Sequence, residues 1–409
     1  MKAAIISIGN ELLSGLTVDT NAAFLSERLM TVGVPTVCGY TVGDEVELIA
    51  EAIDSAASHA DVILITGGLG PTDDDLTRNA LASFLGVELL LDDGLLREIE
   101  AFFEKRNYRM VDKNCVQAYL PEGAAGLPNE LGTAPGIMAK YQEKTIVCMP
   151  GVPYEMKKMF EDSVFGIFDG AEKVVISKKL RCFGKGESSV AEMLGDLMER
   201  GRNPLINCTV HGSVITLHIV ATAATRKQAK SMIARDESCI RQVLGPIIYG
   251  TDNETLSTAV GKLLIEKKKT IALAESCTGG LLAKMLTDTP GCSEYFTYGW
   301  VTYSNQAKTT QLGVDPDLIN QHGAVSECVA EEMAAGARKK AGSNIGIGIT
   351  GIAGPTGSTE HKPLGLVYIC VNIDGDSAVK RYVFPCSREK VRLRAALTAL
   401  DLLRGRLRD

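Results

Sequence analysis

Residues 270–285 join a short apolar run to side chains that could carry out nucleophilic chemistry. The apolar run is typical of a buried strand, and a pair of glycines then leads into residues with helical spacing. A sharp turn between a strand and a helix presents a side chain above the sheet and directs backbone N–H groups toward it. Ser276 and Cys277 are therefore candidate nucleophiles. The turn by itself favours the alternative that Ser276 or Thr278 only caps the helix.

A serine nucleophile needs a base, and residues 301–308 supply two candidates. A lysine that is desolvated in a closed site has a lowered pKa, so Lys308 could accept the serine proton. Tyr303 lies shortly before it and could share that role or orient the lysine. His322 precedes a glycine at an expected helix end, where a capping role is the stronger interpretation.

Two further stretches near the end of the chain could bind an anion such as a nucleotide phosphate. The loop after an expected strand carries Gly351, Gly354 and Gly357, whose backbone N–H groups could face a phosphate. Arg388 and Arg392 are four residues apart on an expected helix, so they share a face. The alternatives are a simple glycine-rich turn and solvated surface arginines. A GxxxxGK motif is missing, so a P-loop ATPase is not indicated.

The N-terminal part has a loop at residues 67–77 that is both glycine-rich and acidic. Its distinctive residues are Gly67, Gly68, Gly70, Asp73, Asp74 and Asp75. Glycines let the backbone approach a phosphate closely, whereas adjacent carboxylates would repel a phosphate unless a divalent cation lay between them. The loop therefore indicates either a metal-bridged phosphate or a solvated acidic turn that begins the next helix. The pattern does not choose between the two.

The elements that must hold the N-terminal loop alternate between strand and helix patterns. They are strand 3–9, helix 21–32, strand 36–41, helix 46–57, strand 61–66 and helix 76–85. This order predicts a parallel sheet with helices on both faces. Ligands bind at the carboxyl ends of strands in such folds, where the polar loop 9–15 is also expected.

The middle of the chain follows a different order. Its expected elements are strand 173–181, helix 188–198, strands 205–209 and 214–221, helix 226–244 and strand 247–249. That order is the split βαβ pattern. It lacks both a GxxG clamp and an aromatic stacking pair, so we expect a packing or dimerisation domain instead of an RNA-binding one. A last domain begins near residue 252, with a helix at 256–267.

Composition limits the class of protein. The chain has 409 residues, of which 45% are hydrophobic and 41 are glycine, and its formal net charge is −7. These values predict two or three globular α/β domains and argue against a chain that coats nucleic acid. Eleven cysteines without a CxxC pair, and five histidines without metal-ligand spacing, indicate reduced thiols in a cytoplasmic protein. No apolar run is long enough to span a bilayer, and the start of the chain does not resemble a signal peptide.

Ten short motifs, taken in order, resemble the CinA (competence-damage-inducible) family. They are GNELLSG, DTNAAFLSERL, ITGGLGPTDDDLT, LGTAPG, MPGVPYEM, AESCTGG, VTYSNQAK, HGAVSE, TGIAGPTG and KPLGLVY. The resemblance implies an α/β protein with three domains. These would be a molybdopterin-binding-like parallel α/β domain at residues 1–169, a small split-βαβ, KH-like domain at 170–251 and an α/β amidase domain at 252–409.

For the C-terminal domain, the resemblance implies a nicotinamide-nucleotide amidase that converts nicotinamide mononucleotide to nicotinate mononucleotide and ammonia. Ser276 would be the nucleophile, Tyr303 and Lys308 its activating partners, and Thr350 a contact beside the substrate. The implied substrate-binding residues are Thr278, Gly279, Gly280, Gly351, Gly354, Gly357, Arg388 and Arg392. No cofactor is expected for this activity.

For the N-terminal domain, the resemblance implies a metal-dependent ADP-ribose pyrophosphatase that releases AMP and ribose 5-phosphate. Asp73, Asp74 and Asp75 would hold a divalent cation. The implied substrate-binding residues are Glu11, Asn21, Gly67, Gly68 and Gly70. We therefore expect a bifunctional cytoplasmic homodimer that acts on small nucleotides, without a membrane or nucleic-acid partner. Two other interpretations stay open: a non-catalytic nucleotide-binding protein accessory to DNA uptake, and a molybdopterin-handling protein.

Overall fold

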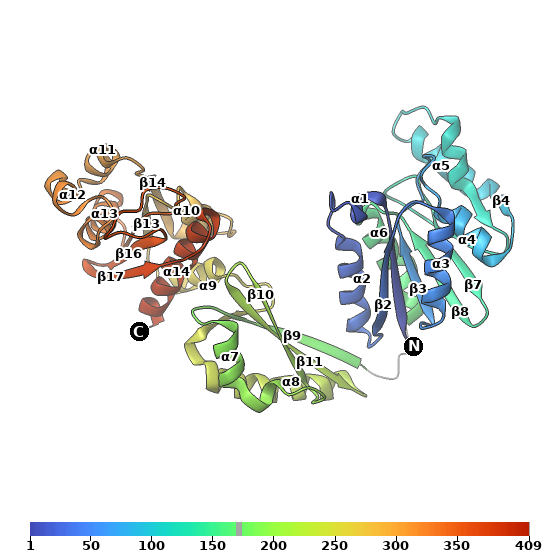
Figure 1. Cartoon of the computed structure of the whole chain (residues 1–409), viewed down its shortest axis with the longest axis horizontal. Coiled ribbons are helices and arrows are strands. Elements are labelled where there is room, and N and C mark those ends of the chain that lie inside the picture. Colours follow the sequence, from blue (N-terminus) through green and yellow to red (C-terminus); the bar gives the residue numbers. More distant parts are fainter. Residues whose placement is uncertain (169–173, 409) are drawn as a thin grey trace. The chain divides into compact units, whose positions relative to one another are not determined.

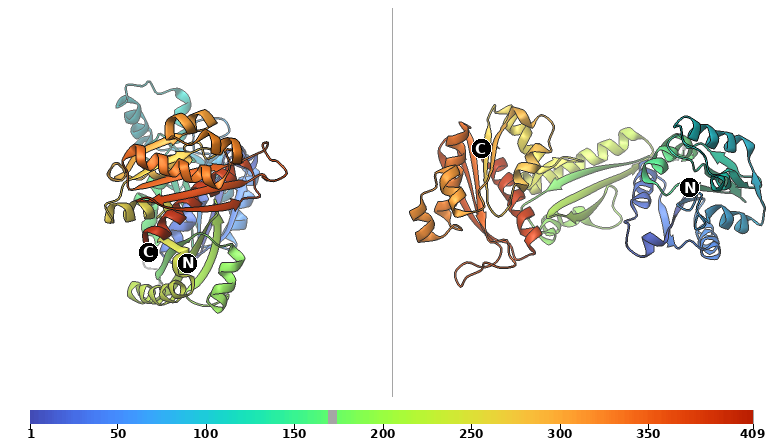
Figure 2. Two further views of the ribbon diagram at one scale, coloured as in Figure 1. Left: turned by 90° about the vertical axis from the view of Figure 1, so that its left-hand side faces the viewer. Right: turned by 90° about the horizontal axis from the view of Figure 1, so that it is seen from above.

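The computed structural model describes residues 1–168 and 174–408, which form two compact units (Figures 1 and 2). One unit contains Met1–Ile176 with Ala221–Ser231, and the other contains Ser177–Val220 with Met232–Asp409. The expected boundary between residues 169 and 170, and the first residue of the expected strand 173–181, lie outside the described residues. Within the described ranges, no helix combines the length and apolar character needed to cross a bilayer.

The N-terminal domain is built on a six-stranded sheet in the order β2-β1-β3-β8-β7-β6. Its elements are β1 (Ala3–Ile8), α1 (Asn10–Leu13), α2 (Thr20–Thr31), β2 (Thr36–Val42), α3 (Val46–Ala57), β3 (Val62–Thr66), α4 (Thr77–Leu85), β4 (Leu89–Leu91), α5 (Asp93–Glu104), β5 (Tyr119–Pro121), β6 (Ala125–Leu127), β7 (Gly136–Tyr141), β8 (Lys144–Met149) and α6 (Pro153–Met159). The strands β2, β1, β3 and β8 are parallel neighbours, as expected. The sheet continues with antiparallel β7 and β6, which the sequence pattern does not predict.

Helices cover both faces of this sheet (Figures 1 and 2). One apolar layer contains Ile49 of α3, Leu81 of α4 and Leu95 of α5, and the other contains Leu25 of α2 and Met156 of α6. Every residue of β1 is buried, because both of its faces are covered. The adjacent strands β1 and β3 therefore end side by side, and their following loops meet at one edge of the sheet.

The middle of the chain forms a four-stranded sheet in the order β10-β11-β9-β12. Its elements are β9 (Val174–Cys182), α7 (Glu187–Leu194), β10 (Leu205–His211), β11 (Val214–Ala223), α8 (Arg226–Leu244) and β12 (Ile248–Thr251). This is the expected split βαβ order. The expected helix 188–198 is divided in the structure, because α7 ends at Leu194 and a 3₁₀ turn, Gly195–Met198, follows.

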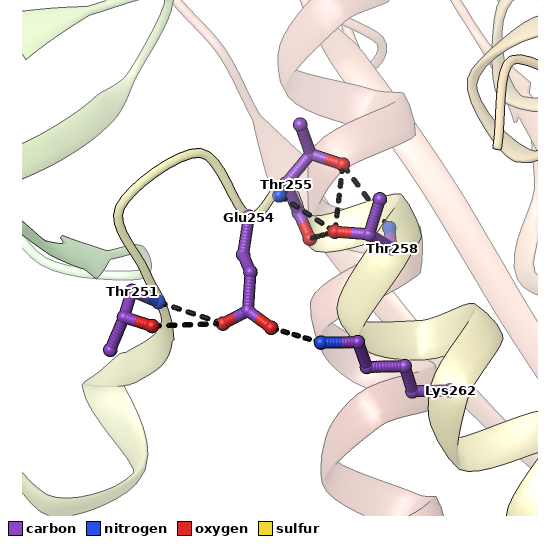
Figure 3. Close-up of polar contacts among 5 residues, drawn as sticks. All are labelled: Thr251, Glu254, Thr255, Thr258 and Lys262. Atoms are coloured by element: carbon purple, nitrogen blue, oxygen red, sulfur yellow. Dashed lines mark hydrogen bonds and ion pairs between the residues drawn. The ribbon is translucent and has the colours of Figure 1, made fainter.

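A hydrogen-bonded turn leads from β12 into α9 (Leu256–Glu266), as Figure 3 shows. The Glu254 carboxylate accepts the Thr251 N–H at 2.8 Å and pairs with Lys262. Thr255 and Thr258 form a capping box, because each side-chain oxygen accepts the backbone N–H of the other, at 3.1 and 2.8 Å. The N–H groups of Thr255 and Thr258 are thereby satisfied, and the helix begins at a defined residue.

The C-terminal domain has a five-stranded sheet in the order β14-β13-β15-β16-β17. Its remaining elements are β13 (Ile271–Glu275), α10 (Leu281–Thr287), β14 (Phe296–Val301), α11 (Asn305–Ala307), α12 (Pro316–His322), α13 (Glu327–Ala341), β15 (Ile345–Gly351), β16 (Leu366–Ile373), β17 (Asp376–Val383) and α14 (Arg388–Arg408). The helices α9, α10 and α14 pack on one face and α12 and α13 on the other. His322 ends α12 and Gly323 follows it, as expected for a helix end.

Candidate functional site

The register of the central strands brings the expected nucleophile to a shared edge of the C-terminal sheet. β13 is parallel to both β14 and β15, so the carboxyl ends of all three strands lie together. The Ser276 N–H donates to the Ile349 carbonyl at 3.0 Å, and the Thr302 N–H donates to the Glu275 carbonyl at 2.8 Å. Ser276, Thr302 and Thr350 therefore lie at or just beyond three neighbouring strand ends.

Lys308 reaches this edge from the π-helical turn Lys308–Leu312. Its Nζ lies 3.1 Å from Ser276 Oγ, 2.8 Å from the Thr302 carbonyl oxygen and 3.4 Å from the Tyr303 carbonyl oxygen. Lys308 is 1% exposed and Ser276 is 9% exposed. The two carbonyl oxygens can accept the two N–H groups of a neutral amine, which leaves its lone pair for the serine hydroxyl. The geometry therefore suits proton transfer from Ser276 to Lys308.

Burial is the main influence on the charge of Lys308. Desolvation lowers the pKa of its ammonium group from 10.5, and the nearby Cys277 sulfur opposes that shift. The three oxygen atoms around Nζ are neutral, so none of them holds the proton as a carboxylate would. A lowered pKa brings the neutral amine, which can act as a base, closer to physiological pH.

Cys277 is a poor alternative to Ser276. Its side chain is 5% exposed and belongs to the apolar core of the domain. Desolvation raises the pKa of the Cys277 thiol to about 12. Because the thiolate is the nucleophilic form of cysteine, this side chain stays unreactive near neutral pH. Of the two expected nucleophiles, Ser276 is the one whose side chain is hydrogen-bonded to Lys308.

Two arginines of α14 connect the loops around Ser276. Arg388 donates to the Gly354 carbonyl at 2.7 Å and to the Tyr303 hydroxyl at 3.1 Å. Arg392 donates through Nε and Nη2 to the Thr278 carbonyl, at 3.2 and 2.8 Å. Tyr303 is 61% exposed, and its backbone carbonyl, not its hydroxyl, contacts the lysine. The structure thus places the Tyr303 hydroxyl beside Arg388 and away from the expected base.

The expected anion-binding loop after β15 is only partly open to solvent. Thr350 is buried, and its hydroxyl donates to the Ala324 carbonyl at 2.7 Å. Gly351 lies against the Leu366 backbone, so close that a Cβ would not fit. Gly354 is buried and Gly357 is exposed. Thr350 and Gly351 therefore form the wall beside the nucleophile, and Gly357 is the glycine of this loop that an anion could reach.

In the N-terminal domain, the glycine-rich acidic loop follows β3 at the edge where β1 also ends. Gly67 has a φ of 106° and packs against the Ile8 carbonyl, so a side chain here would collide with β1. The Thr77 hydroxyl donates to the Gly67 carbonyl at 2.7 Å. Arg78 is buried and donates to the Gly70 carbonyl at 3.2 Å. The start of α4 therefore holds the loop in place.

A cavity of about 420 Å³ opens beside this loop. The expected residues Glu11, Gly67, Gly68, Gly70, Asp74 and Asp75 line it, and so do two further acids, Asp44 and Glu155. Asp73 differs from its neighbours, because its side chain is 92% exposed and pairs with Lys113 at 3.1 Å. The three consecutive aspartates thus do not share one environment.

Asn21 supports the cavity from the neighbouring helix. Its Nδ2 donates to the Thr66 hydroxyl at 2.9 Å and to the Gly151 carbonyl at 2.8 Å. Its amide nitrogen therefore ties the end of β3 to the loop before α6. This contact gives Asn21 a structural role at the site.

The acids around the cavity are the expected ligands of a divalent cation. Among residues 1–168 and 174–408, no group of three or more His, Cys, Asp or Glu side chains is arranged to hold a metal ion by itself. Mg²⁺, however, commonly takes only one or two carboxylates and completes its shell with water and substrate phosphates. Asp74 and Asp75 fit that mode of binding, because both line the cavity beside the glycine backbone.

Family models match three consecutive parts of the chain. Residues 4–169 match a domain described as a probable molybdopterin binding domain, residues 177–250 match the damage-inducible protein CinA KH domain, and residues 253–407 match the CinA C-terminal domain. A competence-damage inducible protein of Clostridium perfringens (strain 13 / Type A) is 44% identical over 409 residues, which cover 100% of this chain and 99% of the relative. The chain belongs to the CinA family.

Two further proteins named after CinA are similar in sequence to this chain. A CinA-like protein of Kosmotoga olearia is 43% identical over 408 residues, covering 100% of this chain and 99% of the relative. A crystal structure of CinA from Thermoplasma acidophilum, a protein of unknown function, matches this chain with 34% sequence identity and a TM-score of 0.37. The match covers 39% of this chain and 94% of the Thermoplasma chain. The family and the α/β fold class expected from the sequence are confirmed.

Sequence patterns do not single out three buried charged residues of this CinA chain. They are Arg78, Glu155 and Glu275. Arg78 holds the glycine loop, Glu155 accepts the Asn129 amide at 2.7 Å beside the cavity, and Glu275 accepts backbone N–H groups of α10. A sequence signal exists for Glu275, which is a charged residue at the end of an apolar strand pattern, where a charge requires hydrogen-bond partners. Arg78 and Glu155 lie in the first turns of helices, where a charged residue does not stand out.

Proposed function

We propose that the chain is a bifunctional hydrolase of pyridine nucleotides. Its C-terminal domain hydrolyses the amide of nicotinamide mononucleotide to nicotinate mononucleotide and ammonia, and its N-terminal domain hydrolyses ADP-ribose to AMP and ribose 5-phosphate. The observation that carries the amidase proposal is the buried Lys308 amine, 3.1 Å from Ser276 Oγ. The substrate follows from the resemblance of the motifs around these residues to the nicotinamide-nucleotide amidase domain.

The amidase reaction uses the serine and the lysine in two steps. Lys308 takes the Ser276 proton while Oγ attacks the amide carbon, and the lysine then gives that proton to the leaving nitrogen, which departs as ammonia. The acyl-enzyme ester is cleaved by water, whose proton passes to Lys308 as the new O–C bond forms. Ser276 regains a proton from the lysine. The product acid releases the second proton of that water to solvent and leaves as a carboxylate. One water is consumed, and both residues return to their starting states.

The substrate phosphate needs cationic or N–H partners near the serine. An arginine has five N–H donors, and Arg388 uses one on Gly354 and one on Tyr303. Arg388 is exposed and contacts the loop that carries the exposed Gly357, whereas Arg392 is half-buried, and this favours Arg388 over Arg392 as the phosphate ligand. Arg392 directs two donors at the Thr278 carbonyl, which gives it a role in shaping the turn.

The experiment that tests the amidase is an assay of the full chain with nicotinamide mononucleotide. Release of ammonia and nicotinate mononucleotide in equal amounts is the expected result. Tight binding of the nucleotide without any ammonia would support the alternative of a non-catalytic nucleotide-binding protein.

Tyr303→Phe distinguishes a substrate contact from a base. The hydroxyl lies on Arg388, so its loss should disturb the phosphate ligand and leave Lys308 in place. We expect KM to rise by about 2- to 10-fold, the range for one hydrogen bond, with little change in kcat. Steady-state kinetics measure both constants. A large fall in kcat at unchanged KM would instead return Tyr303 to the role of activating partner.

The pyrophosphatase proposal is supported by the cavity beside β3, which combines glycine backbone with carboxylates. A diphosphate could approach the backbone of Gly67, Gly68 and Gly70, and a divalent cation held by Asp74 and Asp75 would neutralise its charge. When bound, such a cation would polarise a phosphoryl oxygen. Binding of a pterin without turnover of ADP-ribose would favour the molybdopterin-handling interpretation.

The three aspartates should respond differently to substitution by asparagine. Because Asp74 and Asp75 line the cavity, we expect either change to lower ADP-ribose turnover by at least about tenfold and to raise the metal concentration needed for half-maximal rate. Asp73→Asn is the matched control, since its exposed pair with Lys113 is worth little. Metal-dependent turnover measured for all three variants checks this. An equal loss of turnover in all three variants would contradict the inference that the cavity-lining aspartates hold the cation.

A further inference from the structure

Glu275 precedes the candidate nucleophile, yet its carboxylate is buried in the domain. The residue is 1% exposed. Its Oε2 accepts the N–H groups of Gly280 and Leu282 at 3.0 and 3.1 Å, and its Oε1 accepts the N–H of Ala283 at 2.8 Å. Hydrogen bonds of this charge-assisted kind hold a buried carboxylate in one position. They equally hold the start of α10 against the end of β13.

Most backbone N–H groups of the turn between residues 276 and 284 already have an oxygen acceptor. Backbone carbonyls accept the N–H groups of Ser276, Gly279, Leu281 and Lys284. The Glu275 carboxylate accepts the three described above. In this described segment, the N–H groups of Cys277 and Thr278 are the two without an oxygen acceptor. They directly follow the nucleophile.

These two N–H groups have only a weak acceptor nearby. They lie close enough to the Cys277 sulfur to counter, in small part, the desolvation that raises its pKa. A neutral sulfur binds an N–H poorly, so an oxyanion would be a better acceptor for both groups. The Arg392 guanidinium meanwhile holds the Thr278 carbonyl, which fixes the next peptide group of the turn.

We propose that Glu275 is a positioning residue of the amidase, and that it leaves the N–H groups of Cys277 and Thr278 as the donors to the oxyanion. The inference rests on the proposed amidase function. By binding three N–H groups of the first turn of α10, the carboxylate keeps the turn closed around Ser276. The acyl oxygen then meets two N–H groups that are already in place, which is where hydrogen bonds accelerate acyl transfer most.

Glu275→Gln tests this proposal with almost no change in side-chain volume. The glutamine keeps one acceptor oxygen but directs an NH₂ group at N–H groups that need an acceptor, so the turn should lose its geometry. We expect kcat per titrated active site to fall about 100-fold, the lower range for a lost oxyanion donor, with KM for nicotinamide mononucleotide changed less than about threefold. Glu266→Gln, an exposed glutamate on α9, is the matched control and should keep wild-type kinetics.

A second measurement does not depend on the amide substrate. The rate at which a fluorophosphonate probe labels Ser276 also reports oxyanion stabilisation, and it should fall in parallel with kcat. If the wild type is labelled at Ser276 but releases no ammonia from nicotinamide mononucleotide, the proposed substrate is wrong, and the labelling rate still decides the role of Glu275.

A purely structural cap would behave differently. Glu275→Gln would then lower the melting temperature and the fraction of active enzyme, while the turnover and labelling rate per active site stayed at wild-type values. That result would overturn the proposal. If the glutamine variant does not fold, Glu275→Asp decides in the same way: it keeps the charge but is too short for all three N–H groups. A reduced labelling rate in the aspartate variant supports the proposal, and an unchanged rate overturns it.

Discussion

Ser276→Ala is expected to reduce ammonia release from nicotinamide mononucleotide by about 10⁴-fold or more, the scale seen when an acyl-enzyme nucleophile is removed. The reason is geometric, because Ser276 supplies the hydroxyl that lies 3.1 Å from the Lys308 amine. Alanine fits the turn without strain, so the melting temperature and the turnover of ADP-ribose should stay close to wild type. Initial rates with both substrates, together with a thermal unfolding curve, measure these three quantities.

Cys277→Ala is the control for that experiment. The Cys277 thiol is buried and its pKa is raised to about 12, so it should not act as a nucleophile. We expect this variant to keep most of its amidase activity and to lose some stability from the smaller core side chain. Abolished turnover in Cys277→Ala, combined with activity in Ser276→Ala, would assign the nucleophile to the thiol.

Lys308→Arg is expected to lower kcat by about 10³-fold while leaving KM within a few-fold of wild type. Arginine keeps the positive charge but cannot lose its proton in a protein, so it cannot replace a general base. A lysine that only attracted the substrate phosphate would be replaced by arginine with little loss. Near-normal turnover of a folded Lys308→Arg enzyme would therefore exclude the base role.

The pH dependence of the wild type tests the same role without a substitution. Desolvation lowers the pKa of Lys308 from 10.5, so the neutral amine persists in the folded enzyme at pH values where a solvated lysine is charged. As the pH falls through the lowered pKa, the amine gains a proton and kcat/KM should fall with it. As the pH rises above that pKa, the rate should level off. A profile that rose on acidification would contradict the assignment.

Local patterns are sufficient to predict much of the fold. The helices Val46–Ala57 and Arg226–Leu244 have the bounds that the sequence predicts, because amphipathic spacing and helix ends are properties of neighbouring residues. The strand–turn–helix at Ser276 is predictable for the same reason. Its apolar run is buried on both faces of the sheet, and Gly279 and Gly280 adopt the positive φ values that the turn requires.

Long-range contacts account for what local patterns do not predict. The antiparallel strands β7 and β6 extend a sheet whose earlier strands are parallel, and no short stretch of sequence specifies that pairing. The aspartates at positions 73–75 are equivalent in the sequence, yet only Asp73 pairs with Lys113, which is 40 residues away along the chain. The Tyr303 hydroxyl likewise meets Arg388 from an element 85 residues further on.

Residue types and their local patterns indicate the reactive side chains: a serine at a strand end, a lysine after the next strand, and glycines and acids beside a strand of the N-terminal sheet. How these side chains act together depends on the folded domains. Ser276 and Lys308 are 32 residues apart, and the parallel register of β13 with β14 brings them to the same edge of the sheet. The packing around that edge also removes water from the amine. Desolvation of Lys308, like the burial of Glu275, is a property of the assembled domain, since no residue within either motif could exclude solvent alone.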